Sequence, residues 1–127
     1  VRFVAAPNQA NLIALYENAL GTVMASKLEG WGLPLGESLW LGTPGISAPN
    51  SSLTEVGRDL ALYFDADSPR ELAEIFDKCM NDPAFYTALK KRVVSARPHL
   101  RSWKDVAADL LQTLQSIRNS AAKLAAE

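Results

Sequence analysis

Two glutamates in a glycine-rich segment are the residues of this chain with the clearest chemical potential. Glu29 and Glu37 are eight positions apart in the stretch LEGWGLPLGESLW, which covers residues 28–40. A carboxylate can accept two hydrogen bonds from neighbouring hydroxyls, such as those of a ribose, and it can also face a positive charge. We therefore expect Glu37 to bind a pair of hydroxyls and Glu29 to meet sugar hydroxyls or a developing positive charge.

The residues between the two glutamates favour a tight turn that leads into a helix. Gly30 and Gly32 let the backbone approach a ligand closely, and Pro34 suits the first turn of a helix. Unpaired amides around Gly32 and Leu33, with the positive end of the helix dipole behind them, would form a cradle for phosphate oxygens. The pattern is not a dinucleotide fingerprint, because the third glycine would fall at Leu35 and no Walker-type lysine follows.

Each of these features also has a purely structural interpretation. Two glutamates at this spacing and a glycine-proline helix start occur by chance in many proteins. Trp31 is either a stacking surface for a sugar or base, or an aromatic residue of the core. His99 has no cluster of ligand residues near it, and Cys79 is the only cysteine, so we expect a surface or packing role for His99 and no metal site.

Alternating strands and helices must position the turn. Apolar runs predict strands at 1–5, 20–25, 45–48 and 61–64. Helices are predicted between them at 8–19, at 34–41, and briefly from Ser52, which forms a capping box with Glu55. This alternation is typical of a mostly parallel sheet covered by helices, in which ligands bind beyond the carboxyl ends of the strands. The turn that contains Glu29 lies at that edge.

After Asp65 the sequence predicts helices only. Ser68 and Asp82 each precede a proline and each begin a helix, and the first of these helices is expected to bury Leu72, Ile75, Phe76, Cys79 and Met80. Ser102 can cap the last helix, along which apolar residues follow a 4-3-4-3-4-3 spacing: Trp103, Ala107, Leu110, Leu114, Ile117, Ala121 and Leu124. We expect this seam to pack on the parent protein rather than in a coiled-coil dimer, since it has two alanines and few charged flanking residues.

The composition bounds the class of protein. The chain has 127 residues, 48% of them hydrophobic, and a formal net charge of −1, so we expect no nucleic-acid partner. No apolar run approaches the roughly 20 residues that cross a bilayer, and there is no signal-peptide pattern. We therefore expect a cytoplasmic protein with one domain over residues 1–100, followed by a helix over residues 101–127.

The segment 27–34, KLEGWGLP, followed by Glu37, resembles the E-x7-E region of retaining glycosyltransferases of family 4, usually written E-G-F-G-L-P with a second glutamate. The neighbouring segments resemble the family in the same order, from about residue 1 to 111. Residues 12–19 are similar to its L-x-x-L-Y-x-x-A helix, residues 42–46 to its G-x-P-V strand, and residues 51–56 to its G-x-x-E-V turn. Departures are mild: Ala25-Ser26 replaces a frequent Pro-Ser, Glu37-Ser38 replaces Glu-Ala, and Gly36 replaces a larger residue.

The resemblance implies a Rossmann-like three-layer α/β/α fold, incomplete at its N-terminal side, from the C-terminal donor-binding domain of a GT-B enzyme. It implies that Glu37 takes the ribose hydroxyls of a nucleotide-sugar donor. It places the diphosphate on the amides of Gly32 and Leu33, and the donor sugar at Glu29, the residue closest to the chemistry; Gly30 and Trp31 belong to the same binding segment. Transfer to an acceptor would retain the anomeric configuration and need no cofactor or metal.

The resemblance also implies that essential parts lie upstream of Val1. The family's basic pair for the diphosphate and its acceptor-binding domain, with any peripheral membrane attachment, would lie there, so we expect the fragment alone to be inactive. The strand at 1–5 would lack neighbours, and would be loose or would re-pair through another chain by the exposed sheet edge. A different class of function stays open, namely a non-catalytic Rossmann-like interaction or regulatory module that self-associates or binds partners through the seam of the last helix.

Overall fold

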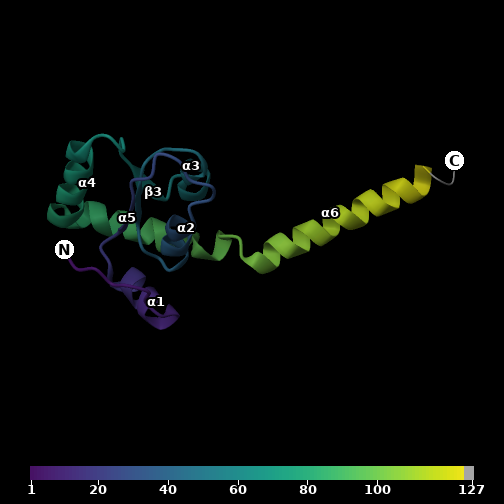
Figure 1. Cartoon of the computed structure of the whole chain (residues 1–127), viewed down its shortest axis with the longest axis horizontal. Helices are drawn as coiled ribbons and strands as arrows, with labels where there is room; N and C mark the ends of the chain where they lie inside the picture. The colour runs from purple at the N-terminus through teal and green to yellow at the C-terminus, as the bar shows by residue number, and fades with distance from the viewer. Residues whose placement is uncertain (125–127) are drawn as a thin grey trace.

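The computed structural model describes residues 1–124, and the side chains of residues 1–121 (Figure 1). The elements in chain order are α1 (Gln9–Asn18), β1 (Thr22–Met24), α2 (Leu33–Trp40), β2 (Gly45–Ser47), α3 (Ser52–Gly57), β3 (Ala61–Tyr63), α4 (Pro69–Asn81), α5 (Pro83–Ala96), the 3-10 helix η1 (Arg97–His99) and α6 (Trp103–Leu124). Strands and helices therefore alternate as far as β3, and helices alone follow, as the sequence predicts.

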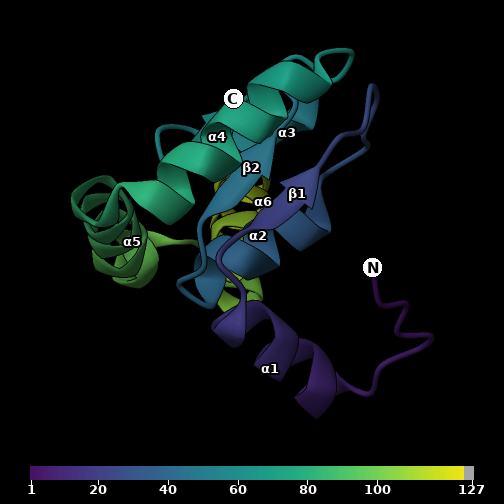
Figure 2. The same cartoon turned by 90° about the vertical axis from the view of Figure 1, so that its left-hand side faces the viewer.

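The strands form one parallel sheet in the order β1-β2-β3. Val23 of β1 lies opposite Ile46 of β2, which in turn lies opposite Leu62 of β3. Helices α2 and α3 cover one face of the sheet and α4 covers the other (Figure 2). All three residues of β2 are buried, as expected for a central parallel strand between two helical layers. The predicted Rossmann-like α/β/α fold is confirmed.

The predicted strand at residues 1–5 is wrong. These residues have no strand pairing, and Val1, Phe3 and Val4 are exposed. A strand forms only where a neighbouring strand completes its hydrogen-bond ladder and covers its apolar face, and the described residues place none beside this segment. Within this chain the segment is therefore unpaired, and its pairing with a second chain stays a prediction.

The core lies mainly between α2, α3 and the sheet, and α5 closes it. Its buried cluster consists of Leu35, Leu39, Leu53, Leu60, Ala61 and Val93. The buried Ser38 hydroxyl ties α2 to the sheet, because it donates to the carbonyl oxygen of Thr43 (2.9 Å) and accepts from the hydroxyl of Thr22 (2.8 Å). The last turn of α2 is therefore held beside the amino ends of β1 and β2.

Most predicted helix caps are confirmed. Asn8 accepts a hydrogen bond from the Asn11 amide (2.8 Å), and Asp82 accepts one from the Phe85 amide (2.9 Å). Ser68 caps α4 in the same way. The capping box at Ser52 is wrong, because Ser52 is already inside α3 and its hydroxyl donates to another loop, described below.

The buried face of α4 is narrower than predicted. Cys79 is buried, and burial raises the pKa of its thiol. Leu72, Ile75 and Phe76 are half-buried, whereas Met80 is 61% exposed, so its predicted burial is wrong. Successive helical residues are about 100° apart around the axis, which carries Met80 past the stripe that faces the sheet.

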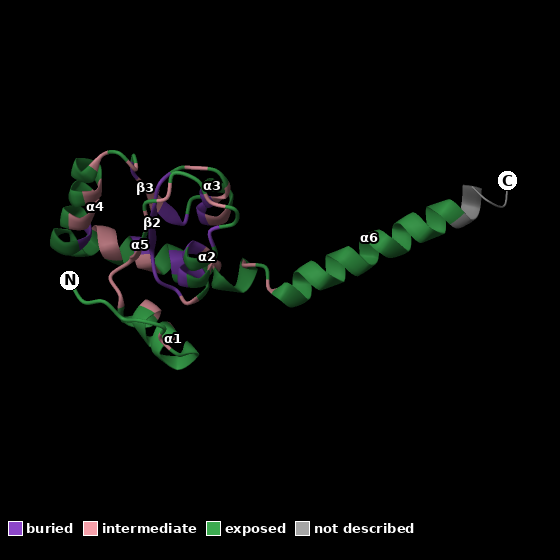
Figure 3. Cartoon of the chain, viewed as in Figure 1, coloured by how far each residue is buried: buried purple, intermediate pink, exposed green. Residues whose placement is uncertain are grey.

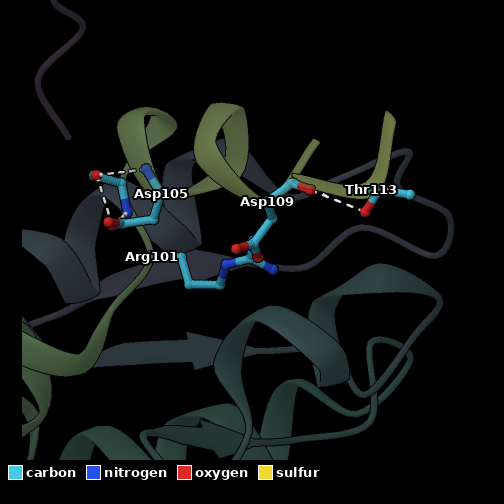
Figure 4. A network of polar contacts seen from close by, with 5 residues as sticks. Arg101, Asp105, Asp109 and Thr113 are labelled. Atoms are coloured by element: carbon cyan, nitrogen blue, oxygen red, sulfur yellow. Dashed lines mark hydrogen bonds and ion pairs between the residues drawn. The ribbon is translucent and has the colours of Figure 1, made fainter. Parts of the chain in front are cut away.

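Helix α6 extends away from the rest of the molecule (Figure 1), and every side chain described from 103 to 121 is exposed (Figure 3). The side chain of Leu124, the last predicted seam residue, is outside the described side chains. Ser102 caps the helix and Asp105 reciprocates by accepting from the Ser102 amide (2.7 Å), while Arg101 pairs with Asp109 (Figure 4). Hydrogen bonds from Ser102 lower the pKa of Asp105. Within residues 1–124, no helix combines the length and apolarity needed to cross a membrane.

Candidate functional site

The predicted tight turn is present between β1 and α2. Gly32 occupies the position before the helix with φ +82° and ψ 42°, a left-handed conformation that favours glycine. A Cβ atom at Gly32 would also lie 2.6 Å from Cδ2 of Leu53 in α3. The backbone conformation therefore favours glycine at this position, and a larger residue would also displace the end of the Leu53 side chain. Gly30 is different, because a Cβ atom there would meet nothing within 4 Å.

The first turn of α2 leaves amide groups free. Leu35 and Gly36 donate their amides to the carbonyl oxygen of Gly32, at 3.1 and 3.2 Å, and Pro34 has no amide hydrogen. The amides of Gly32 and Leu33 have no hydrogen-bond partner among the described residues. Free amides at the positive end of a helix dipole favour an anion, so the start of α2 has the chemistry of the predicted phosphate cradle.

Glu29 is half-buried and held at two points. Its carboxylate Oε1 accepts a hydrogen bond from the Ser26 hydroxyl at 2.5 Å. Its carbonyl oxygen accepts from the hydroxyls of Ser51 (2.7 Å) and Ser52 (3.3 Å), which belong to the start of α3. The second carboxylate oxygen is free of hydrogen bonds from the described residues, so one oxygen of Glu29 is available to a ligand.

Glu37 is exposed on α2, one turn beyond the free amides. Its Oε2 accepts a hydrogen bond from the phenol of Tyr16 at 3.0 Å, and the hydroxyl of Thr43 donates to the Tyr16 carbonyl oxygen at 2.7 Å. Burial, and then the hydrogen bond to Glu37, raise the pKa of Tyr16 to about 12. The phenol therefore stays a neutral donor at ordinary pH and holds the Glu37 side chain against α1.

The structure excludes one of the two interpretations of Trp31. Its side chain is 63% exposed, and the flanking Leu33 is also exposed, so Trp31 is not a core aromatic. An exposed indole next to free amides offers a flat apolar surface to a sugar or base. Its role in binding remains a prediction.

A separate hollow lies at the same edge of the sheet. This open cavity of about 480 Å³ lies over the ends of β2 and β3 and is lined by Lys27, Pro49, Asn50, Tyr63, Phe64, Asp65, Ala66, Asp67 and Glu71. Lys27 pairs with Asp67 at 2.5 Å beside it. Neither Glu29 nor Glu37 lines the hollow, so we base the candidate site on the turn, which carries Glu29 and the free amides, and on Glu37 one turn along α2.

Other candidate residues have simpler roles. His99 is exposed in η1, which confirms the predicted surface position. Across the described residues, no three or more His, Cys, Asp and Glu side chains gather closely enough to hold a metal ion.

Tyr16, Ser26, Ser51 and Ser52 contact the two glutamates, yet their types and spacing did not identify them in the sequence. Ser26 offered a weak signal, because a serine three residues before a glutamate often makes a local hydrogen bond. The contacts of Ser51 and Ser52 with Glu29 span more than 20 positions, so only the fold reveals them.

Comparison with known families assigns the chain. The family described as "Glycosyl transferases group 1" matches residues 1–95, which include the whole parallel sheet and the turn with both glutamates. The chain therefore belongs to the group 1 glycosyltransferases and is a glycosyltransferase-type sugar-transfer module, a class that acts on a nucleotide-sugar donor and an acceptor. Searches of curated proteins and of solved structures found no match.

Proposed function

We propose that the chain is part of the C-terminal, donor-binding domain of a retaining glycosyltransferase of family 4. The observation that carries the proposal is the turn between β1 and α2. It carries Glu29 and two free amides at the start of α2, at the carboxyl edge of a parallel sheet, and Glu37 follows one turn along the helix.

Each part of a nucleotide sugar has a matching group in this turn. Glu37 keeps Oε1 free while Tyr16 holds Oε2, so its carboxylate can accept from the ribose hydroxyls. The free amides of Gly32 and Leu33 suit the diphosphate. The free oxygen of Glu29 would accept from the donor sugar or face the positive charge that develops when the sugar leaves.

The leaving diphosphate needs more positive charge than this turn provides. Between residues 27 and 37 the sequence has one basic residue, Lys27, and that side chain is paired with Asp67. We propose that further cationic groups and the acceptor site belong to other parts of the complete enzyme, and that the isolated chain does not transfer sugar. The proposal includes transfer with retention and without a bound metal or cofactor, as the family resemblance implies.

Calorimetric titration of the complete enzyme with UDP, GDP, ADP and their sugar derivatives tests the donor role. One nucleotide should bind selectively, and Glu37→Ala should weaken its binding by roughly tenfold or more, the size expected for hydrogen bonds to a charged group. Glu29→Ala should instead depress turnover. Glu17→Ala, which removes an exposed glutamate next to Tyr16, is the matched control and should bind as the wild type does. Normal binding and turnover in both site variants would refute the donor role.

A non-catalytic interaction module is the second candidate, and the exposed apolar seam of α6 favours it. It predicts that substitutions such as Leu110→Asp and Leu114→Asp abolish association with a partner or a second copy, while Glu37→Ala has no effect. The two proposals therefore give opposite results for the same set of variants.

A further inference from the structure

The loop between β2 and α3 is tied to the turn that carries Glu29. The Asn50 side-chain amide donates to the Ser26 carbonyl oxygen at 2.9 Å. The hydroxyls of Ser51 and Ser52 both donate to the carbonyl oxygen of Glu29. Three consecutive side chains, two from this loop and one from the first residue of α3, therefore hold the main chain of the turn at two points.

The side chain of Glu29 is held as well. The Ser26 hydroxyl donates to Oε1 at 2.5 Å, and Asn50 fixes the main chain of the same serine. The direction of the carboxylate thus depends on Ser26, whose position depends on the β2–α3 loop. These neighbours therefore orient both the main chain and the side chain of Glu29, and they leave the carboxylate oxygen Oε2 free.

Ser51 adopts a strained conformation to make its contact. Its φ of 51° and ψ of −129° lie in a region that residues with a Cβ atom rarely occupy. Its side chain is exposed, so core packing does not explain the strain. The buried Leu53, two residues later, packs against Gly32 and holds the loop close to the turn.

We propose that Ser26, Asn50, Ser51 and Ser52 form a brace that positions the Glu29 carboxylate toward the donor sugar. This inference rests on the proposed function, since it assigns a partner to the free oxygen of Glu29. The four side chains are positioning residues, because their hydrogen bonds go to Glu29 and its turn. A displacement of about 1 Å at a reacting group can lower a rate about 100-fold, so such a brace has a direct effect on sugar recognition.

The test separates sugar recognition from nucleotide binding. Calorimetry on the complete enzyme compares the Kd of UDP with that of UDP-glucose, of GDP with GDP-mannose, and of ADP with ADP-glucose. Within each pair, the Kd of the nucleoside diphosphate divided by that of the nucleotide sugar measures how much the sugar increases the affinity. Ser26→Ala removes a hydrogen bond to the Glu29 carboxylate, and Ser51→Ala removes one to the Glu29 carbonyl oxygen. Each should reduce that ratio by roughly tenfold, because the carboxylate loses its position, and leave the Kd of the nucleoside diphosphate unchanged.

Three variants distinguish positioning from general stability. Ser26→Thr keeps the hydroxyl and should restore the wild-type ratio. Ser51→Gly relieves the strained backbone, so this variant should be at least as stable as the wild type in thermal unfolding. It should still show the reduced ratio between the two Kd values, because the hydroxyl is lost. Ser116→Ala removes an exposed hydroxyl that donates to a helix carbonyl oxygen in α6. It should change neither the ratio of the two Kd values nor the thermal stability.

The outcomes separate this inference from the proposed function. If the wild type binds none of the probes, or if Glu37→Ala binds them as well as the wild type, the donor role fails and the brace fails with it. If Glu37→Ala loses binding but the Ser26→Ala and Ser51→Ala variants keep the wild-type ratio, the donor role holds and the brace alone is wrong. A wild type that gains no affinity from any sugar would also overturn the brace.

Discussion

Helices α2 and α6 carry similar apolar spacing but differ completely in burial. Leu35 and Leu39 of α2 are 0% and 1% exposed, whereas Leu110 and Leu114 of α6 are 59% and 54% exposed (Figure 3). Both patterns predict a helix with one apolar face. The comparison shows that an apolar pattern identifies which face of a helix avoids water. Whether another element of the same chain packs on that face depends on the tertiary structure.

The largest expected effect is on the α2 side of this comparison. Leu35→Ala should lower the free energy of unfolding by about 2–5 kcal/mol, because it leaves a cavity among Leu39, Leu53 and the sheet. Urea denaturation followed by circular dichroism measures the change. A loss below about 1 kcal/mol would show that the core around α2 is loosely packed.

A smaller effect is expected where the turn enters α2. Gly32→Ala should destabilise the chain by about 1–3 kcal/mol, since it places a Cβ atom at positive φ and against Leu53. Gly30→Ala, where the added atom meets open space, is the matched control and should stay within about 0.5 kcal/mol of the wild type. Equal effects in the two variants would contradict the structure of the turn.

The link between α1 and α2 predicts a dependence on pH. Tyr16 has a pKa raised from 10.0 to about 12, so the folded state retains this proton more tightly than the unfolded state. The contribution of this proton to the free energy of unfolding is complete below pH 10, and it is lost as the pH rises from 10 to about 12. Below pH 10, Tyr16→Phe should cost about 1 kcal/mol, the usual contribution of one hydrogen bond. The difference between wild type and variant should shrink between pH 10 and pH 12 in urea titrations, and a constant difference would contradict the assignment.

The smallest effect is expected on α6. Leu114→Ala should change the unfolding free energy of this chain by less than about 0.5 kcal/mol, because the side chain is exposed. The same urea titrations measure it, with sedimentation velocity to detect association. A loss above about 1 kcal/mol, or a concentration-dependent stability, would show that a second copy covers the seam in solution.

Local chemistry made much of the fold predictable. Asn8, Ser68 and Asp82 cap helices through hydrogen bonds that reach only three residues along the chain, so their residue types were sufficient. The segment 1–5 was predicted wrongly because an apolar run specifies a strand only when another strand lies beside it. Ser52 was predicted wrongly because α3 begins one residue earlier than expected, which places Ser51 at the N-cap position and Ser52 inside the helix.

The candidate site also combines features that local sequence predicts with features that depend on tertiary contacts. The sequence by itself determined the turn, its glycine at position 32, the helix start behind it and the spacing of Glu29 and Glu37, because each depends on backbone preferences within a few residues. Only the tertiary structure decided that Trp31 is exposed, that Tyr16 holds Glu37, and that the β2–α3 loop holds Glu29. The physical reason is that the contacts of Tyr16 with Glu37 and of Ser51 with Glu29 join segments about 20 positions apart, which meet only when the helices and loops pack around the parallel sheet.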